Sequence, residues 1–199
     1  MPEKTVQKEP GKKPAPSKKP KPQQEVVVQI PLSELHPFPD HPFQVREDAS
    51  MQETAESVKE YGVLVPALAR PREDGGYELI AGHRRKHACE LAGLATMPVI
   101  VRDIDRDAAT IIMVDSNLQR ENILPSERAK AYKMKMEAIK RQGARTDLTS
   151  PKISAKFRSD DEVGQDAGVS GDTIRNYIAL TQLVPELQQM VDEKKIALS

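Results

Sequence analysis

Two short polar runs in this sequence have the residue types that bind phosphate. The first is Gly82 followed by His83, Arg84 and Arg85, directly after the alternating segment 77–81. Adjacent guanidinium groups can hold phosphate oxygens through paired hydrogen bonds, and a glycine lets an anion approach the backbone N–H groups at a helix start. The first run therefore predicts a phosphate site.

The same run places Arg84, Arg85 and Lys86 in the first turn of an expected helix. Positive charges oppose the helix dipole at that end, which costs stability unless an anion lies among them. A bound phosphate resolves the conflict. A solvated basic helix start has the same pattern and is the alternative.

The second run, 115–122, follows the apolar segment 111–114 and is rich in amides and charged groups. Side-chain oxygens at this density can hold magnesium and reach a ribose or a phosphate. An elaborate helix C-cap would use the same residues, so this run alone leaves both interpretations open.

A third segment, 161–178, has the rhythm of a helix-turn-helix: Gly164 where the helices cross, Gly168 at the turn, and apolar Ile174 and Ile178 on the second helix. Ser170 is the expected cap of that helix. A helical hairpin that only packs is the alternative. The residues expected to face base edges or phosphates are Ser170, Asp172, Thr173, Arg175 and Asn176.

Basic residues gather outside this motif. The chain has 30 Lys or Arg and 30 Asp or Glu, yet residues 126–158 hold ten basic residues against three acidic ones, while 154–199 hold five against eight. Affinity for DNA phosphates must then come mostly from the mid-chain block. The residues assigned to it are Lys130, Lys133, Lys135, Lys140, Arg141, Arg145, Lys152, Lys156 and Arg158.

Hydrophobic periodicity predicts the elements that position these runs. Strands are expected at 26–30, 64–69, 77–81 and 97–101, and helices at 50–61, capped by Ser50, and at 83–91; the proline-rich segment 36–46 is a loop. Helices follow at about 108–119 and 125–141. The expected fold is an α+β domain with a small mixed sheet, followed by an all-α helix-turn-helix domain.

These elements divide the chain into a lysine- and proline-rich disordered tail (1–24), a nucleotide-binding domain (25–122) and a helical DNA-binding domain (123–199) with its helix-turn-helix at about 160–180. The boundary between the domains falls between about 105 and 125. No apolar run is long enough to span a bilayer, and a single cysteine excludes a disulfide framework. A cytoplasmic protein is expected.

Three motifs together resemble those of ParB and Noc-type chromosome and plasmid partition proteins. They are 42–46, 81–85 and 117–122, the last followed by Pro125, in the family's order and spacing. The resemblance covers about residues 30–199. It implies a CTP-binding domain of the ParB and sulfiredoxin-like fold, a helix-turn-helix domain that binds a palindrome called parS, and a homodimeric clamp that closes around DNA in the nucleoid.

The resemblance also implies roles for single residues. Gln44 is expected near the γ-phosphate, as the one catalytic candidate, and Asn117 at magnesium and the phosphates. The implied nucleotide site comprises Gln44, Arg46, Gly82, His83, Arg84, Arg85, Asn117, Arg120 and Glu121.

Three residues depart from the family pattern. His83 and Ser116 stand where glutamate is usual, and His87 stands where arginine is usual. Without the carboxylate before Asn117, a magnesium or hydrolysis group is lost, and Asp115 replaces it as a magnesium ligand only if the backbone shifts. We therefore expect CTP binding rather than turnover, with at most weak CTPase activity.

The resemblance leaves two further expectations. The lysine-rich tail is expected to contact a ParA-type ATPase, and the chain ends before the family's C-terminal dimerisation domain. The competing function is an ATP-dependent kinase or sulfiredoxin-like enzyme on the same fold. Sulfiredoxin has cysteine where this chain has Gly82, and Cys89 is expected to be a small buried residue.

Overall fold

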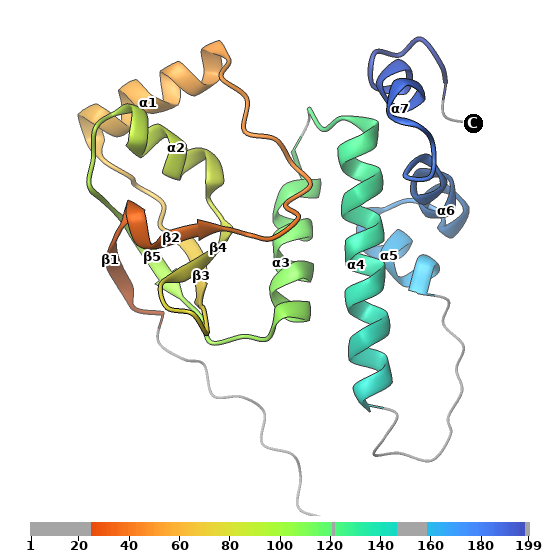
Figure 1. Ribbon diagram of the computed structural model, residues 1–199, viewed down its shortest axis with the longest axis horizontal. Helices are drawn as coiled ribbons and strands as arrows, with labels where there is room; N and C mark the ends of the chain where they lie inside the picture. The colour runs from red at the N-terminus through yellow and green to blue at the C-terminus, as the bar shows by residue number, and fades with distance from the viewer. Residues whose placement is uncertain (1–24, 121, 147–158, 198–199) are drawn as a thin grey trace, which may run out of the picture.

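Five strands form one mixed sheet in the first half of the chain (Figure 1). The computed structural model describes residues 25–120, 122–146 and 159–197. The sheet order is β1-β5-β3-β4-β2; β1–β5 and β3–β4 are antiparallel, and β3–β5 and β2–β4 are parallel. The strands are β1 (Val27–Pro31), β2 (Leu35–Pro37), β3 (Ala67–Pro71), β4 (Tyr77–Ala81) and β5 (Thr96–Val101).

The expected mixed sheet is confirmed, with one strand more than the sequence predicted. The segment 36–46 was expected to be wholly loop, but Leu35–Pro37 forms the edge strand β2 beside β4. A proline is tolerated at the end of an edge strand because it gives up no ladder hydrogen bond there. After β2 the chain runs as a loop toward α3 (Figure 1).

Two helices cover one face of the sheet: α1 (Ala49–Tyr61) and α2 (His83–Leu91). Their apolar residues join one buried cluster with the strands, including Met51, Val58, Leu79, Cys89, Met97 and Val99. Ser50 was expected to cap α1, which is wrong. The carboxylate of Asp48 accepts from Met51 N at 2.8 Å, so the cap lies two residues earlier and the helix begins at Ala49.

The opposite face of the sheet packs against α3 (Arg106–Leu118), and α4 (Pro125–Thr146) lies beside α3 on the side away from the sheet (Figure 1). Leu79 and Ile80 are adjacent on β4 and therefore point to opposite faces, and both are fully buried. Ile80 joins Phe43, Met113 and the α4 residue Ala131 in a second cluster. The strand before Gly82 is thus held on both faces.

The second half of the chain packs around α4. Ala129 contacts the cluster of α6 and α7, and Tyr132 contacts the cluster of α5 and α6. These helices are α5 (Ser159–Ala167), α6 (Gly171–Leu180) and α7 (Pro185–Asp192). Helix α4 therefore contributes buried residues to both halves of the chain.

The helix-turn-helix prediction is confirmed by α5 and α6. A Cβ on Gly164 would lie 2.6 Å from Val169 O, so only glycine allows the two helices to cross so closely. Ser170 caps α6, with its hydroxyl accepting from Thr173 N at 3.2 Å.

Among the described residues, no helix is long and apolar enough to cross a membrane.

Candidate functional site

The turn from β4 into α2 has the geometry of an anion site. Gly82 lies between them at φ +115°, and a Cβ there would lie 2.8 Å from the Cβ of Ala67. No side chain caps the helix, and no acidic residue lies in its first turn. The free N–H groups of this turn therefore point toward solvent with Arg84 and Arg85 beside them.

The two arginines are held differently. Arg84 lies within 3.3 Å of Ser50 Oγ and 3.6 Å of Asp48 Oδ1, contacts that a phosphate can displace. Arg85 donates from Nη1 to the carbonyl oxygens of Val65 and Pro66, both at 2.6 Å. Arg84 is therefore the freer ligand, whereas Arg85 also fixes the segment before β3.

Two histidines stack at the centre of the site. The rings of His41 and His83 lie 3.9 Å apart, and His41 Nδ1 is 2.8 Å from Phe43 O, so it donates to that carbonyl. The Nε2 atoms of both rings are buried without a hydrogen-bond partner. Each is a polar atom that a bound ligand can satisfy.

Burial keeps both imidazoles neutral. Desolvation, with smaller contributions from His41 and Lys86, lowers the pKa of His83 to about 3. Desolvation also lowers the pKa of His41, and Arg120 adds to this while Phe43 O and Glu127 oppose it. Neither ring brings a positive charge to the site near neutral pH.

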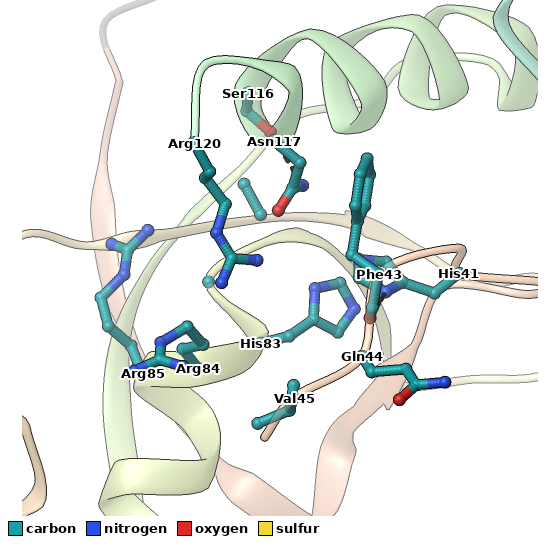
Figure 2. A pocket seen from close by; sticks show the side chains of 12 residues that line it. His41, Phe43, Gln44, Val45, His83, Arg84, Arg85, Ser116, Asn117 and Arg120 are labelled. Atoms are coloured by element: carbon teal, nitrogen blue, oxygen red, sulfur yellow. Dashed lines mark hydrogen bonds between the residues drawn. The ribbon is translucent and has the colours of Figure 1, made fainter. Parts of the chain in front are cut away.

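The end of α3 forms the opposite wall. Asn117 Nδ2 donates to Met113 O at 2.8 Å, and Ser116 Oγ donates to the same carbonyl at 2.9 Å. In Figure 2, Asn117 and Arg120 extend from this end toward His83. The amide oxygen of Asn117 is thereby turned into the cavity.

A loop anchored on α4 closes the third side. Glu127 accepts from Gln44 N at 3.1 Å and from Leu124 N at 3.2 Å, and it lies 3.6 Å from Arg46. Glu127 is buried, and the sequence analysis did not identify it. Its place three residues after Leu124, at the start of a helix, is the capping signal that points to it.

These three walls enclose two adjoining cavities. The inner cavity, about 180 Å³, is lined by residues within 41–45, 81–85 and 116–120. The outer cavity, about 480 Å³, shares Gln44, Arg84 and Arg120 with it. The predicted residues Gln44, Gly82, His83, Arg84, Arg85, Asn117 and Arg120 thus meet at one place, with Arg46 in the outer cavity. Glu121 lies outside the described residues.

Asp115, the expected magnesium ligand, lies elsewhere. Its carboxylate accepts from Lys135 Nζ at 2.7 Å, and the same ammonium donates to Asp166 on α5 at 2.9 Å. Asp115 lines a different cavity from Asn117. The described residues hold no group of three or more His, Cys, Asp or Glu that could bind a metal ion.

The ion pairs of Lys135 with Asp115 and Asp166 correct one part of the DNA-binding prediction. Lys135 is 1% exposed and cannot reach a phosphate. Arg141 is exposed, but its guanidinium already donates to Asp107 at 2.8 Å. Lys130, Lys133 and Lys140 are exposed as well. The side chains of Arg145, Lys152, Lys156 and Arg158 lie outside the described residues.

The start of α6 carries the residues expected to read DNA. Asp172, Arg175 and Asn176 are exposed. Arg175 is ion-paired with Asp172 and with Asp160 of α5, which raises its pKa further. A DNA phosphate or base edge must therefore compete with two carboxylates for this guanidinium.

Comparison with known proteins shows the family to which this chain belongs. The ParB N-terminal domain family matches residues 16–118, more than half of the chain and the whole of the sheet. The chain belongs to the ParB family. The chain is 36% identical over 171 residues to the chromosome-partitioning protein Spo0J of Thermus thermophilus, and the match covers 85% of this chain and 56% of that protein.

Other relatives agree with this ParB assignment. Stage 0 sporulation protein J of Bacillus subtilis is 31% identical over 88% of this chain and 56% of its own length. The chain spans about half the length of the curated relatives it matches. A C-terminally truncated ParB from Caulobacter crescentus, solved bound to its centromeric parS site, superposes with a TM-score of 0.56 at 27% identity, over 86% of this chain and 80% of that one.

Cys89, the single cysteine of the chain, does not line either nucleotide cavity. Cys89 is fully buried, as expected, and desolvation raises the pKa of its thiol. Gly82 occupies the helix start instead. No observation on the described residues favours a kinase.

Proposed function

We propose that this chain is a sequence-specific DNA-binding protein of the ParB type that binds a parS-like palindrome. It uses CTP as a switch for clamp closure and spreading, in DNA partition or in the maintenance of a mobile element. One observation supports this most directly: the nucleotide cavity and the helix-turn-helix share α4. Glu127, near its start, anchors the loop over the cavity, and Tyr132, further on, packs against α5 and α6. A ligand that moves the loop acts on the helix that carries the DNA-binding fold.

The partners follow the family. The Caulobacter protein was solved on its parS site, and we extend DNA binding to this chain on that basis and on the confirmed helix-turn-helix. The assignment of CTP as the nucleotide rests on the three motifs, which meet at the two cavities. A homodimer, nucleoid association and a ParA-type ATPase that contacts residues 1–24 remain predictions.

Magnesium fits these residues poorly. The expected ligand Asp115 is paired with Lys135, and the other expected ligand, Asn117, offers only a neutral amide oxygen. Magnesium in proteins is usually held by one or two carboxylates together with substrate phosphates. We therefore assign the cation no part in the proposed site.

Titration with labelled CTP, ATP, GTP and UTP, with and without a library of palindromic DNA, tests the proposal. CTP is expected to bind most tightly, and its binding is expected to change when the selected palindrome is present, because the two sites share α4. Tight binding of ATP that does not depend on DNA would contradict the proposal and favour the kinase.

A further inference from the structure

The described residues that line the inner cavity carry positive charges and no negative ones. Three arginines and two histidines line it, and no aspartate or glutamate is among the described residues that do. The arginines are Arg84, Arg85 and Arg120, from two walls of the cavity. The field in this cavity is therefore positive before any ligand enters.

The nearest described carboxylates already have partners. Asp48 caps α1 and lies 3.6 Å from Arg84, and Glu127 accepts from two backbone N–H groups. Both line the outer cavity and not the inner one. Asp115 is bound to Lys135 on the far side of α3. Recruiting any of them to a cation would break a contact that holds an element in place.

Among the described residues, the remaining side-chain oxygens of the inner cavity are neutral. Gln44 and Asn117 carry amide oxygens, and Ser116 carries a hydroxyl that donates its hydrogen to Met113 O. A hard divalent cation needs near-complete oxygen coordination, and the nearby guanidinium groups repel it. The same guanidiniums attract a free triphosphate, which carries more negative charge than its magnesium complex.

We infer that this site takes its nucleoside triphosphate without a divalent cation, with Arg84, Arg85 and Arg120 neutralising the phosphate charge that magnesium would otherwise neutralise. The inference rests on the proposed function and specifies the ligand form that the site accepts. The pair of unpartnered His Nε2 atoms beside these arginines offers the ligand neutral polar contacts in place of metal-bound oxygens.

Calorimetric titration of the intact chain with CTP, in EDTA and in magnesium at equal ionic strength, tests it. The two dissociation constants are expected to agree within about fivefold. A loss of more than about fivefold in EDTA would overturn the inference while leaving CTP binding intact. Absence of CTP binding in both buffers would instead overturn the proposed function, and this inference with it.

A matched pair of variants tests the cause. Ser116→Glu places a carboxylate beside Asn117, and we expect it to weaken CTP binding in EDTA by about tenfold, with recovery in magnesium. Ser116→Gln, of the same length without charge, is expected to keep the ratio of the two affinities near one. A Ser116→Glu protein whose affinity ratio stays near one would contradict the assignment of charge as the reason.

Discussion

His83 is the residue on which the chemistry of the cavity depends most. It follows Gly82 at the helix start, stacks on His41 at 3.9 Å and keeps a buried nitrogen without a partner. A carboxylate at this position would repel phosphate, whereas a neutral imidazole does not. Histidine in place of the family's usual glutamate thus removes a negative charge that would weaken anion binding in the inner cavity.

His83 also predicts a pH dependence of stability. Its pKa is about 3 in the folded chain and near 6.5 in a model peptide, so the unfolded state binds more protons between these values. Stability is therefore fully present above about pH 6.5 and falls as the pH is lowered. Between pH 7 and pH 5, the free energy of unfolding of His83→Asn is expected to fall by about 2 kcal/mol less than that of the wild type, measured by urea unfolding. Equal losses in both proteins would contradict this.

Arg84 and Arg85 are predicted to differ although they are adjacent. Arg84→Ala is expected to weaken CTP binding at least about tenfold, since hydrogen bonds to charged groups contribute about 1.5–3 kcal/mol. DNA affinity without nucleotide and the melting temperature are expected to change little. Arg85→Ala is expected to weaken CTP binding and also to lower the melting temperature, because the carbonyls of Val65 and Pro66 lose their donor. Identical melting temperatures for the two variants would show that the carbonyl contacts are not structural.

At the scale of elements, α4 joins the two halves of the molecule. Ala131 faces the sheet cluster and Tyr132 the helix-turn-helix cluster. Lys135, one turn later, pairs with Asp115 of α3 and Asp166 of α5. Burial opposes its charge, but the hydrogen bonds and the negative charges of Asp115 and Asp166 together outweigh desolvation, so the pKa of Lys135 is raised.

Lys135→Met is predicted to loosen this junction. Its two acidic partners are half exposed and regain water, so the expected loss is about 1–3 kcal/mol of unfolding free energy rather than that of a fully buried charge. Lys133→Met on the exposed face of the same helix is the control and is expected to change stability by less than about 0.5 kcal/mol. Urea unfolding measures both. Equal stabilities of the two variants would refute the role of the triad.

Sequence periodicity was enough to predict most elements but not the contacts between distant ones. Helix 83–91 was predicted with its observed bounds because Gly82 and Gly93 flank it, and Ser170 caps α6 as expected. The burial of Lys135 could not be predicted, because its partners lie 20 and 31 residues away along the chain. The local capping contact of Glu127 with Leu124 N could have been predicted, but its contact with Gln44, 83 residues away along the chain, could not.

At the scale of the whole molecule, charge is divided between α4 and the helix-turn-helix. Lys130, Lys133 and Lys140 are exposed on α4, whereas α5 and α6 expose Asp161 and Asp172 among others. The neutral overall charge is therefore the sum of a basic α4 and an acidic helix-turn-helix formed by α5 and α6. Sequence-independent attraction to DNA is expected from α4, and base discrimination from the start of α6.

This division predicts separable effects on DNA binding. Neutralising Lys130, Lys133 and Lys140 together is expected to weaken binding to all sequences alike and to reduce the salt slope by about 0.9 for each lysine that contacts a phosphate. Arg175→Ala is expected to change sequence preference more than the salt slope. Fluorescence anisotropy with matched and scrambled palindromes at several salt concentrations measures both. The same pattern for the two proteins would contradict the division.

A crystal structure of the intact chain grown with CTP tests the central claim most directly. We expect the triphosphate at the start of α2, within hydrogen-bond distance of its N–H groups and of Arg84 and Arg120. A nucleotide bound in any other cavity, or a triphosphate that contacts neither arginine, would contradict the proposed site.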